Sequence, residues 1–315
     1  MKAIIVERFG GAERLKFGEF PKPQLQEHEI LVEIQCTSVN PVDWKIREGL
    51  LSKVFPTRFP YIPGWDASGI VVECGVKTKK FKKGDRIFSY CRKSEVHEGT
   101  YAEYISIEEK HVALMPSSLS FAEAAAIPLV GLTAWQSLFD IGNLKANQTI
   151  LIVGGSGGVG SMAIQFAKHA GATVYTTASQ VHHAYVKKLG AEKVIDYQKD
   201  NVQEKIKEWE PEGVDVILDL VGGHALQECY PLVKKHGRLI SIVEKPAVFQ
   251  HIHTDYAFGT PSGQELQKIA TLIDQGKIVP PKISILSLEK AAEAQEEVKA
   301  GHTEGKIVLA VKNHP

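Results

Sequence analysis

A glycine-rich segment at residues 154–160 restricts the folds open to this chain more than any other feature of its sequence. It directly follows residues 150–153, an unbroken apolar run that predicts a strand buried on both faces. After the glycines, apolar residues recur at helical spacing, and Gly171 follows where a helix would end. These apolar positions are Val159, Met162, Ala163, Phe166, Ala167 and Ala170. A strand, a glycine turn and an amphipathic helix in this order are typical of a parallel α/β sheet.

The glycines match the pattern G-x-G-x-x-G at Gly155, Gly157 and Gly160. Glycine lets the backbone turn sharply and approach a pyrophosphate closely, and a helix N-terminus offers unpaired N–H groups and partial positive charge to the anion. We therefore predict that this loop binds a dinucleotide. The predicted contacts are Gly155, Ser156, Gly157, Gly158 and Val159.

The residues after the next predicted strand, 173–177, indicate which dinucleotide is bound. Proteins that bind NAD usually carry an Asp or Glu about 20 residues further on, where it binds the ribose hydroxyls. No acidic residue occurs between Ser161 and Ala191. Ser179 and either His182 or His183 could instead donate hydrogen bonds to a 2′-phosphate. The sequence therefore favours NADP(H).

The pattern of apolar residues differs between two parts of the chain. Up to about residue 120, short apolar runs separated by Gly and Pro predict a β-rich barrel or sandwich. From about residue 149, strands alternate with helices, as in a doubly wound parallel sheet. The later predicted elements are strands at 193–197, 214–219, 238–243 and 306–311 and helices at 262–276 and 288–301.

Composition excludes several classes of partner. Lys plus Arg and Asp plus Glu each number 37, so the zero net charge favours neither nucleic acid nor an anionic membrane. No apolar run reaches the roughly 18 residues that a membrane helix needs, and the first residues predict a short strand rather than a signal peptide. The four cysteines lack C-x-x-C spacing, which predicts reduced thiols in a cytoplasmic protein.

Further segments occur in a characteristic order along nearly the whole chain. They are 38–49, 63–69, 84–86, 99–104, 131–134, the glycine loop, 194–197 and 301–309. In these segments the chain resembles the zinc-independent quinone oxidoreductase (zeta-crystallin-like) branch of the medium-chain dehydrogenase/reductase superfamily. The resemblance implies a Rossmann domain with a doubly wound parallel sheet at 123–262. This domain is inserted into a GroES-like, β-rich catalytic domain formed by 1–122 and 263–315.

The same resemblance implies a homodimer that reduces quinones or α,β-unsaturated carbonyls with NADPH. Zinc-dependent relatives share the overall plan, but a catalytic zinc needs three ligands of Cys, His or Asp/Glu type. Where those relatives carry a ligand Cys this chain has Asn40, and where they carry a ligand His it has Trp65. Their structural zinc needs four clustered cysteines, and this region offers only Cys91. We therefore expect no metal.

Without a Lewis acid, an electron-poor acceptor is favoured, because hydrogen-bond donors suffice to stabilise enolate-like charge. The resemblance places Asn40 beside the nicotinamide ribose or the substrate carbonyl, and Lys45 where several relatives carry a tyrosine near the substrate. Lys45 could donate a proton or point to solvent. Other residues that the resemblance places around the cofactor are Thr133 in the cleft, Tyr197 near the adenine or 2′-phosphate, and Val221 and Val243 along the nicotinamide.

Several alternatives stay open. Asp43 and Arg47 are expected to form a structural ion pair rather than a catalytic one. Many relatives carry Lys-Asn where this chain has Val181 and His182, which weakens the preference for NADP(H). An enoyl-thioester reductase would need a basic cluster for a CoA phosphate, and a non-catalytic dinucleotide-binding protein is the third hypothesis. Residues 250–261 could shape a pocket, form a dimer edge or be a surface loop.

Overall fold

A computed structural model describes residues 1–301 and 303–312, which form two units. The first unit contains residues 1–129 and 260–315, and the second contains residues 130–259. The units divide at 129/130 and 259/260, whereas the expected domain boundaries are 122/123 and 262/263 and stay a prediction. A central segment is therefore inserted into a unit that both ends of the chain build. None of the helices in the described part of the chain is long and apolar enough to cross a membrane.

The second unit is a six-stranded sheet in which every pairing is parallel, in the order β10-β9-β8-β11-β12-β13. This is the doubly wound order, with the chain reversing direction across the sheet between β8 and β11. The strands are β8 (Thr149–Val153), β9 (Thr173–Thr177), β10 (Lys193–Ile195), β11 (Val214–Asp219), β12 (Val233–Ser241) and β13 (His253–Tyr256). The helices are α4 (Gly158–His169), α5 (His183–Lys188), α6 (Val202–Trp209) and α7 (Gly223–Cys229), with a π-helix at Gln136–Ile141 and 3₁₀ turns at Gln180–His182 and Tyr230–Leu232.

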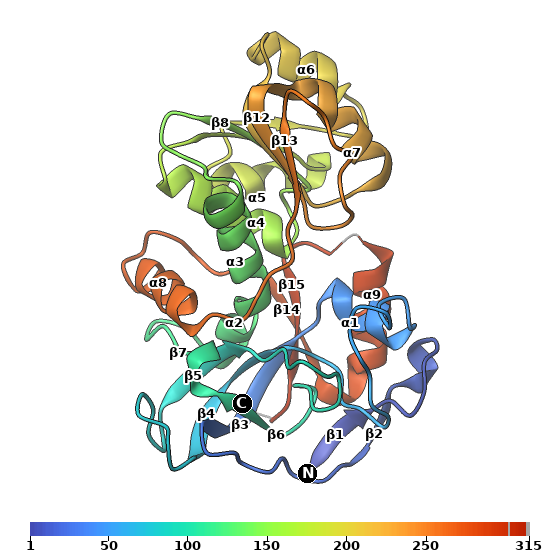
Figure 1. Ribbon diagram of the computed structural model, residues 1–315, viewed down its shortest axis with the longest axis vertical. Coiled ribbons are helices and arrows are strands. Elements are labelled where there is room, and N and C mark those ends of the chain that lie inside the picture. Colours follow the sequence, from blue (N-terminus) through green and yellow to red (C-terminus); the bar gives the residue numbers. More distant parts are fainter. Residues whose placement is uncertain (302, 313–315) are drawn as a thin grey trace. The chain divides into compact units, whose positions relative to one another are not determined.

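Strand β8 shows why this sheet is covered on both faces. Ile150, Leu151, Ile152 and Val153 are all buried, and side chains alternate between faces along a strand. Leu151 and Val153 pack in one core with residues of α6 and α7. Helix α4 lies on the other side of the sheet (Figure 1). The predicted α/β class with a parallel sheet is therefore confirmed.

The first unit is built on a seven-stranded, mainly antiparallel sheet in the order β14-β15-β3-β4-β5-β7, with β6 also paired to β3. Its strands are β3 (Glu29–Ser38), β4 (Asp66–Cys74), β5 (Arg86–Tyr90), β6 (Tyr104–Glu108), β7 (Val112–Leu114), β14 (Ile283–Ser287) and β15 (Lys306–Ala310), and β1 (Lys2–Ile5) and β2 (Lys16–Glu19) form a separate pair. Its helices are α1 (Pro41–Arg47), α2 (Phe121–Ala125), α8 (Gly263–Asp274) and α9 (Ala291–Ala300), with 3₁₀ turns at Ala12–Arg14, Glu109–His111 and Leu288–Lys290. Helix α3 (Pro128–Trp135) begins in this unit and ends in the second.

The C-terminal strand completes the first unit. Val308, Leu309 and Ala310 of β15 pair with residues 36–38 of β3 (Figure 1). Ile30, Val32 and Ile34 of β3 alternate into one core with residues of β4, β5 and β6. The last strand is therefore an interior strand of the sheet, between β14 and β3, although it is more than 260 residues from β3 in sequence.

Three sequence-based predictions of elements were imprecise. The strand predicted at 193–197 ends at Ile195, because Asp196 begins a turn in which it accepts a hydrogen bond from the Gln198 amide. The strand predicted at 238–243 spans Val233–Ser241 instead. Residues 250–261 contain β13, the edge strand beside β12, which the His-rich sequence did not indicate. Helices α8 and α9 follow the predicted pattern, with Ser262 accepting from the Glu265 amide and Gly301 ending α9 in the left-handed region.

Candidate functional site

The glycine loop connects β8 to α4 and is fixed to the end of the neighbouring strand. Gly154 has φ +90°, a conformation that favours glycine. Its N–H donates to Thr177 Oγ1, and the N–H of Gly155 donates to the Thr177 carbonyl, each at 3.0 Å. The loop is therefore held in one conformation by β9.

The glycines of this loop are required for different reasons. A Cβ on Gly155 would lie 2.1 Å from Thr176 Oγ1, and one on Gly160 would lie 2.3 Å from the Gly154 carbonyl. A Cβ on Gly157 would meet nothing closer than the Gly154 carbonyl at 4.0 Å, and its φ is −76°. Packing within the protein therefore explains Gly155 and Gly160 but does not explain Gly157.

Helix α4 begins after Gly157 and has no acidic residue in its first turn. Its first N–H groups have no partner within the helix, as at every helix N-terminus, and they carry partial positive charge. The five predicted contacts, residues 155–159, are the last residues of the loop and the first of this helix. The arrangement fits an anion such as a pyrophosphate.

The turn after β11 lies against the glycine loop. Asp219 is fully buried and accepts from the amides of Val221 and Gly222 and from the Ser241 hydroxyl at 2.7 Å. Val221 is 54% exposed. A Cβ added to Gly154 would lie 3.1 Å from the Val221 side chain, which is its nearest neighbour. A Cβ on Gly222 would meet the Val243 side chain at 2.8 Å. The structure thus places Val221 beside the loop and Val243 beside the neighbouring Gly222, both just after the carboxyl ends of strands.

The residues predicted to select the cofactor follow β9 and β10. Ser179 and His182 are half-buried at the 3₁₀ turn after β9, and the ring of His183 contacts the Ala178 carbonyl through Nε2 at 3.1 Å. Tyr197 is 52% exposed in the turn after β10. Thr133, by contrast, is buried in α3, where its hydroxyl lies next to the Gly259 backbone. All of these assignments remain predictions.

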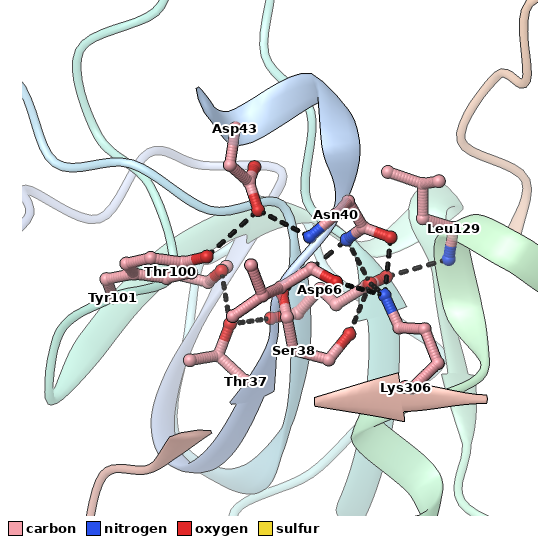
Figure 2. A network of polar contacts seen from close by, with 10 residues as sticks. Thr37, Ser38, Asn40, Asp43, Asp66, Thr100, Tyr101, Leu129 and Lys306 are labelled. Carbon is pink, nitrogen blue, oxygen red and sulfur yellow. Dashed lines mark hydrogen bonds and ion pairs between the residues drawn. The ribbon is translucent and has the colours of Figure 1, made fainter. Parts of the chain in front are cut away.

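A buried polar cluster occupies the first unit, between the end of β3 and the start of β15 (Figure 2). We call it the Asn40 network. Its members are Thr37, Ser38, Asn40, Asp43, Asp66, Thr100, Tyr101, the backbone amide of Leu129 and Lys306. Ser38 Oγ and Asn40 Nδ2 each donate to Asp66 Oδ2 at 2.7 Å, and the Leu129 amide donates to Asp66 Oδ1 at 2.7 Å. Every side chain of this network is buried.

Asn40 lies at the centre of this network, and both ends of its amide are engaged. Its Oδ1 accepts from Lys306 Nζ at 2.5 Å, while its Nδ2 donates to Asp66 and more weakly to the Ser38 carbonyl at 3.5 Å. Lys306 Nζ also donates to the Val39 carbonyl at 2.7 Å and lies 3.7 Å from Asp66 Oδ2. The structure thus surrounds the predicted catalytic Asn40 with protein partners.

The expected ion pair between Asp43 and Arg47 is wrong. Asp43 accepts hydrogen bonds from the backbone N–H of Asn40 at 2.8 Å and from the Tyr101 hydroxyl at 2.9 Å. Arg47 is fully buried and binds Glu48 and Glu296 instead. Residues four apart lie on the same face of a helix, but each of these two has a different partner. Helix α9 supplies an acidic partner for Arg47 that is far from it in sequence.

Burial controls the protonation of this cluster. It raises the pKa of Asp43 to about 7 and also raises the pKa of Asp66, because a carboxylate loses hydration inside the protein. It lowers the pKa of Lys306 for the same reason. No sequence pattern pointed to Asp66 or Lys306 as functional, although a Lys within an apolar terminal strand was a usable signal.

Lys45 lies on α1, five residues beyond Asn40. It is half-buried, its Nζ is 5.8 Å from the centre of the Trp44 ring, and burial lowers its pKa. A lowered pKa makes a lysine a better proton donor near neutral pH. The choice between a proton donor and a solvated side chain stays open.

The positions considered for metal ligands are buried. Trp65 packs edge-on against Phe55, Asn40 is engaged as described, and Cys91 lies in the core. Within residues 1–301 and 303–312, no group of three or more His, Cys, Asp or Glu side chains is placed to hold a metal ion.

Comparison with known proteins places this chain among its relatives. The alcohol dehydrogenase GroES-like domain family matches residues 26–117, and a zinc-binding dehydrogenase family matches residues 189–309. The 2-methylene-furan-3-one reductase of Solanum lycopersicum is 34% identical, over 98% of this chain and 79% of that protein. The NADPH-dependent alkenal/one oxidoreductase of Arabidopsis thaliana is 32% identical, over 98% and 79%. The quinone oxidoreductase from Coxiella burnetii has a TM-score of 0.88, with 32% identity and 99% of each chain covered.

The glycine loop on a parallel sheet, inserted into a GroES-like unit, defines a two-domain dehydrogenase or reductase. The chain belongs to the medium-chain dehydrogenase/reductase superfamily, among its quinone and alkenal oxidoreductases.

Proposed function

We propose that this protein reduces quinones or α,β-unsaturated carbonyls with NADPH and without zinc. The observation that carries the proposal is the glycine loop, where Gly157 is open on the side of the α4 N-terminus and is not explained by packing. Relatives described as alkenal/one and quinone oxidoreductases support the substrate class. The lack of an acidic residue between Ser161 and Ala191 supports NADPH.

The residues of the second unit would hold the cofactor. Backbone amides at residues 155–159 would bind the pyrophosphate, and Ser179 with His182 would bind the 2′-phosphate. When bound, NADPH supplies a hydride to the acceptor's electron-poor carbon. In an enone the C=C electron pair then becomes an enolate, and a proton added at the α-carbon completes the saturated ketone. The protein's part is to position the acceptor, exclude water and stabilise the enolate oxygen with hydrogen bonds.

Lys45 is our candidate for the protein group that holds this proton. Its partial burial lowers its pKa, and its position on α1 matches the site where relatives carry a tyrosine. A tyrosine hydroxyl and a lysine ammonium can each give up a proton at the end of a long side chain. Water is the alternative donor, and a Lys45→Met variant with unchanged kcat would favour it.

The proposal of zinc independence rests on the residues at the ligand positions. An amide and an indole stand where zinc relatives have a thiolate and an imidazole. The match to a zinc-binding dehydrogenase family covers residues 189–309, which include neither Asn40 nor Trp65.

The experiment follows oxidation of NADPH and of NADH after chelator treatment, each against 1,4-benzoquinone, an ortho-quinone, a simple enone and an enoyl-CoA. We expect turnover with NADPH and at least one of these acceptors. Turnover with an enoyl-CoA only would support the enoyl-thioester reductase, and tight NADPH binding without any turnover would support the non-catalytic protein. Activity that the chelator abolishes and zinc restores would overturn zinc independence.

We also propose a cytoplasmic homodimer. Burial raises the pKa of Cys36 to about 11 and that of Cys91 to about 12, so these thiols resist oxidation, as suits a reducing compartment. Sedimentation or light scattering measures the subunit number, and a monomer at micromolar concentration contradicts the dimer.

A further inference from the structure

The buried carboxylate of Asp66 joins segments that are far apart in the sequence. It begins β4, and it is contacted by Asn40 after β3, by the Leu129 amide in α3 and by Lys306 at the start of β15 (Figure 2). Asp66 is fully buried and Lys306 is only 4% exposed. A buried ion pair therefore lies where four chain segments meet.

The hydrogen bonds define the charge state of this pair. Ser38 Oγ, Asn40 Nδ2 and the Leu129 amide all donate to Asp66, and Lys306 lies on the same side, so the carboxyl group acts only as an acceptor. Lys306 Nζ donates to the Val39 carbonyl and to Asn40 Oδ1, and it lies at the ion-pair distance of 3.7 Å from Asp66 Oδ2. These three oxygens surround it as they would an ammonium. The contacts are those of an ionised carboxylate and an ionised lysine.

Two helices begin at this pair. Asn40 is the N-cap of α1, and its backbone N–H donates to the Asp43 carboxyl group in the first turn of that helix. Leu129 is the second residue of α3, so Asp66 accepts one of the N–H groups that lack a partner within that helix. Helix α1 carries Lys45, the candidate proton donor, and helix α3 carries Thr133, which the resemblance places at the cofactor.

We propose that Lys306 and Asp66 are positioning residues, which hold the starts of α1 and α3 and, through α1, orient Lys45 for the reaction. The role given to Lys45 rests on the proposed function, whereas the coupling of the ion pair to the two helix starts does not. Asn40 is in this proposal the bridge between the ammonium and the carboxylate, rather than a group that contacts substrate.

The physical reason is that buried charges must be balanced. Removing one member leaves an unpaired buried charge, which is far more costly than removing both members together. Substitution of Lys306 alone or of Asp66 alone therefore disturbs the helix starts. Substitution of both restores neutrality, and the amide in D66N can donate to Asn40 Oδ1 in place of the lost ammonium.

The experiment compares K306M, D66N and the K306M/D66N double variant with K2M. Lys2 pairs with Glu19 at 2.9 Å in the same unit, but both side chains are largely exposed. Hydrogen exchange of the full-length protein is measured by mass spectrometry, and kcat and KM are measured with NADPH and the best acceptor. We expect faster exchange at residues 41–47 and 128–135 in both single variants, and near wild-type exchange in the double variant and in K2M.

The kinetic readout tests positioning. We expect kcat of the single variants to fall by about 10- to 100-fold, since small displacements of reacting groups have effects of that size. The KM of the acceptor should change less, and the double variant should recover part of kcat. If K306M does not fold, hydrogen exchange and kcat are compared between D66N, which leaves the Lys306 charge unpaired, and the charge-balanced double variant.

Three outcomes overturn the proposal. The first is unchanged hydrogen exchange at both helix starts in the single variants. The second is a double variant whose effects are the sum of those of K306M and D66N. The third is faster hydrogen exchange in the single variants without any change in kcat. If the wild-type protein has no turnover on any acceptor, the proposed function fails, while the exchange measurement alone still decides whether the pair holds the helices.

Discussion

The glycine loop and the Asn40 network hold charge in opposite ways. The loop offers backbone N–H groups and a helix N-terminus, without a single ionised side chain between residues 154 and 160. The network buries two carboxylates and an ammonium and satisfies them with hydroxyls and amides. Backbone dipoles do not titrate, so the charge that the loop presents does not change with pH near neutrality. The stability of the network depends on which of its groups are ionised.

This contrast also separates what each region can tolerate. The loop is sensitive to added volume, because three of its glycines lie against neighbouring atoms or adopt a left-handed conformation. The network is sensitive to changes of charge at constant volume. Substitutions that change one property and keep the other therefore distinguish the two regions.

The largest expected effect is on the pH dependence of stability and concerns Asp43. Its pKa is raised from 3.8 to about 7, so the folded protein holds a proton that the unfolded chain releases, and stability falls as the pH rises from about 4 to about 7. D43N keeps an acceptor for the Asn40 amide and the Tyr101 hydroxyl but cannot ionise. Urea unfolding should show D43N equal to wild type near pH 4 and more stable by up to about 4 kcal/mol at pH 8.

Asp215 of the second unit provides the control with the opposite sign. Burial raises its pKa, but hydrogen bonds from Thr149 and Lys234 outweigh that effect and hold the pKa below its usual range. D215N should therefore be less stable than wild type at neutral pH, with a deficit that vanishes as the pH falls below about 4. A stability difference between D43N and wild type that stays constant from pH 4 to 8 would contradict the assignment of Asp43.

The second effect is one of volume in the loop. A Cβ on Gly160 would lie 2.3 Å from the Gly154 carbonyl and 2.7 Å from the Gly155 Cα, and both are backbone atoms that cannot move aside freely. G160A should lower the unfolding free energy by about 1–3 kcal/mol and weaken NADPH binding. Chemical denaturation and fluorescence titration measure the two effects, and full stability in G160A would show that the loop relaxes easily.

The matched substitution G157A should act on binding alone. The added methyl group meets no protein atom closer than 4.0 Å, and alanine at an N-cap costs at most about 1 kcal/mol. A methyl group between the backbone and a pyrophosphate should weaken NADPH binding by about tenfold, or about 1.4 kcal/mol. Equal NADPH affinity in G157A and wild type would remove the observation on which the proposed function rests.

The smallest effect concerns the choice of cofactor. Ser179 is half-buried where NAD-binding proteins carry an acid, and S179D would place a negative charge beside a 2′-phosphate. Repulsion of about 1 kcal/mol at this half-buried site should shift the ratio of the NADPH and NADH dissociation constants roughly fivefold toward NADH. A ratio that does not move would place the adenosine ribose away from Ser179.

The sequence was informative for the glycine loop and uninformative for the contacts of the Asn40 network. Residues 155–159 and their helix were predicted because strand, turn and helix are consecutive, and local patterns record consecutive structure. The predicted pair of Asp43 and Arg47 failed because residues four apart on a helix are neighbours but form an ion pair only if neither has a better partner elsewhere in the fold. Helix α9 brings Glu296 to Arg47, and Tyr101 binds Asp43.

By itself, the sequence determined the class of fold, the inserted parallel sheet, the glycine loop and the family. Hydrophobic periodicity and glycine positions act over a few residues and can be followed along the chain. Only the tertiary structure decided that Lys306 lies within 3.7 Å of Asp66, that Asn40 is enclosed between them, and that β13 forms the edge of the parallel sheet. Those contacts join residues up to 266 positions apart, and their partners are chosen by packing and charge balance in the folded interior, which no local pattern encodes.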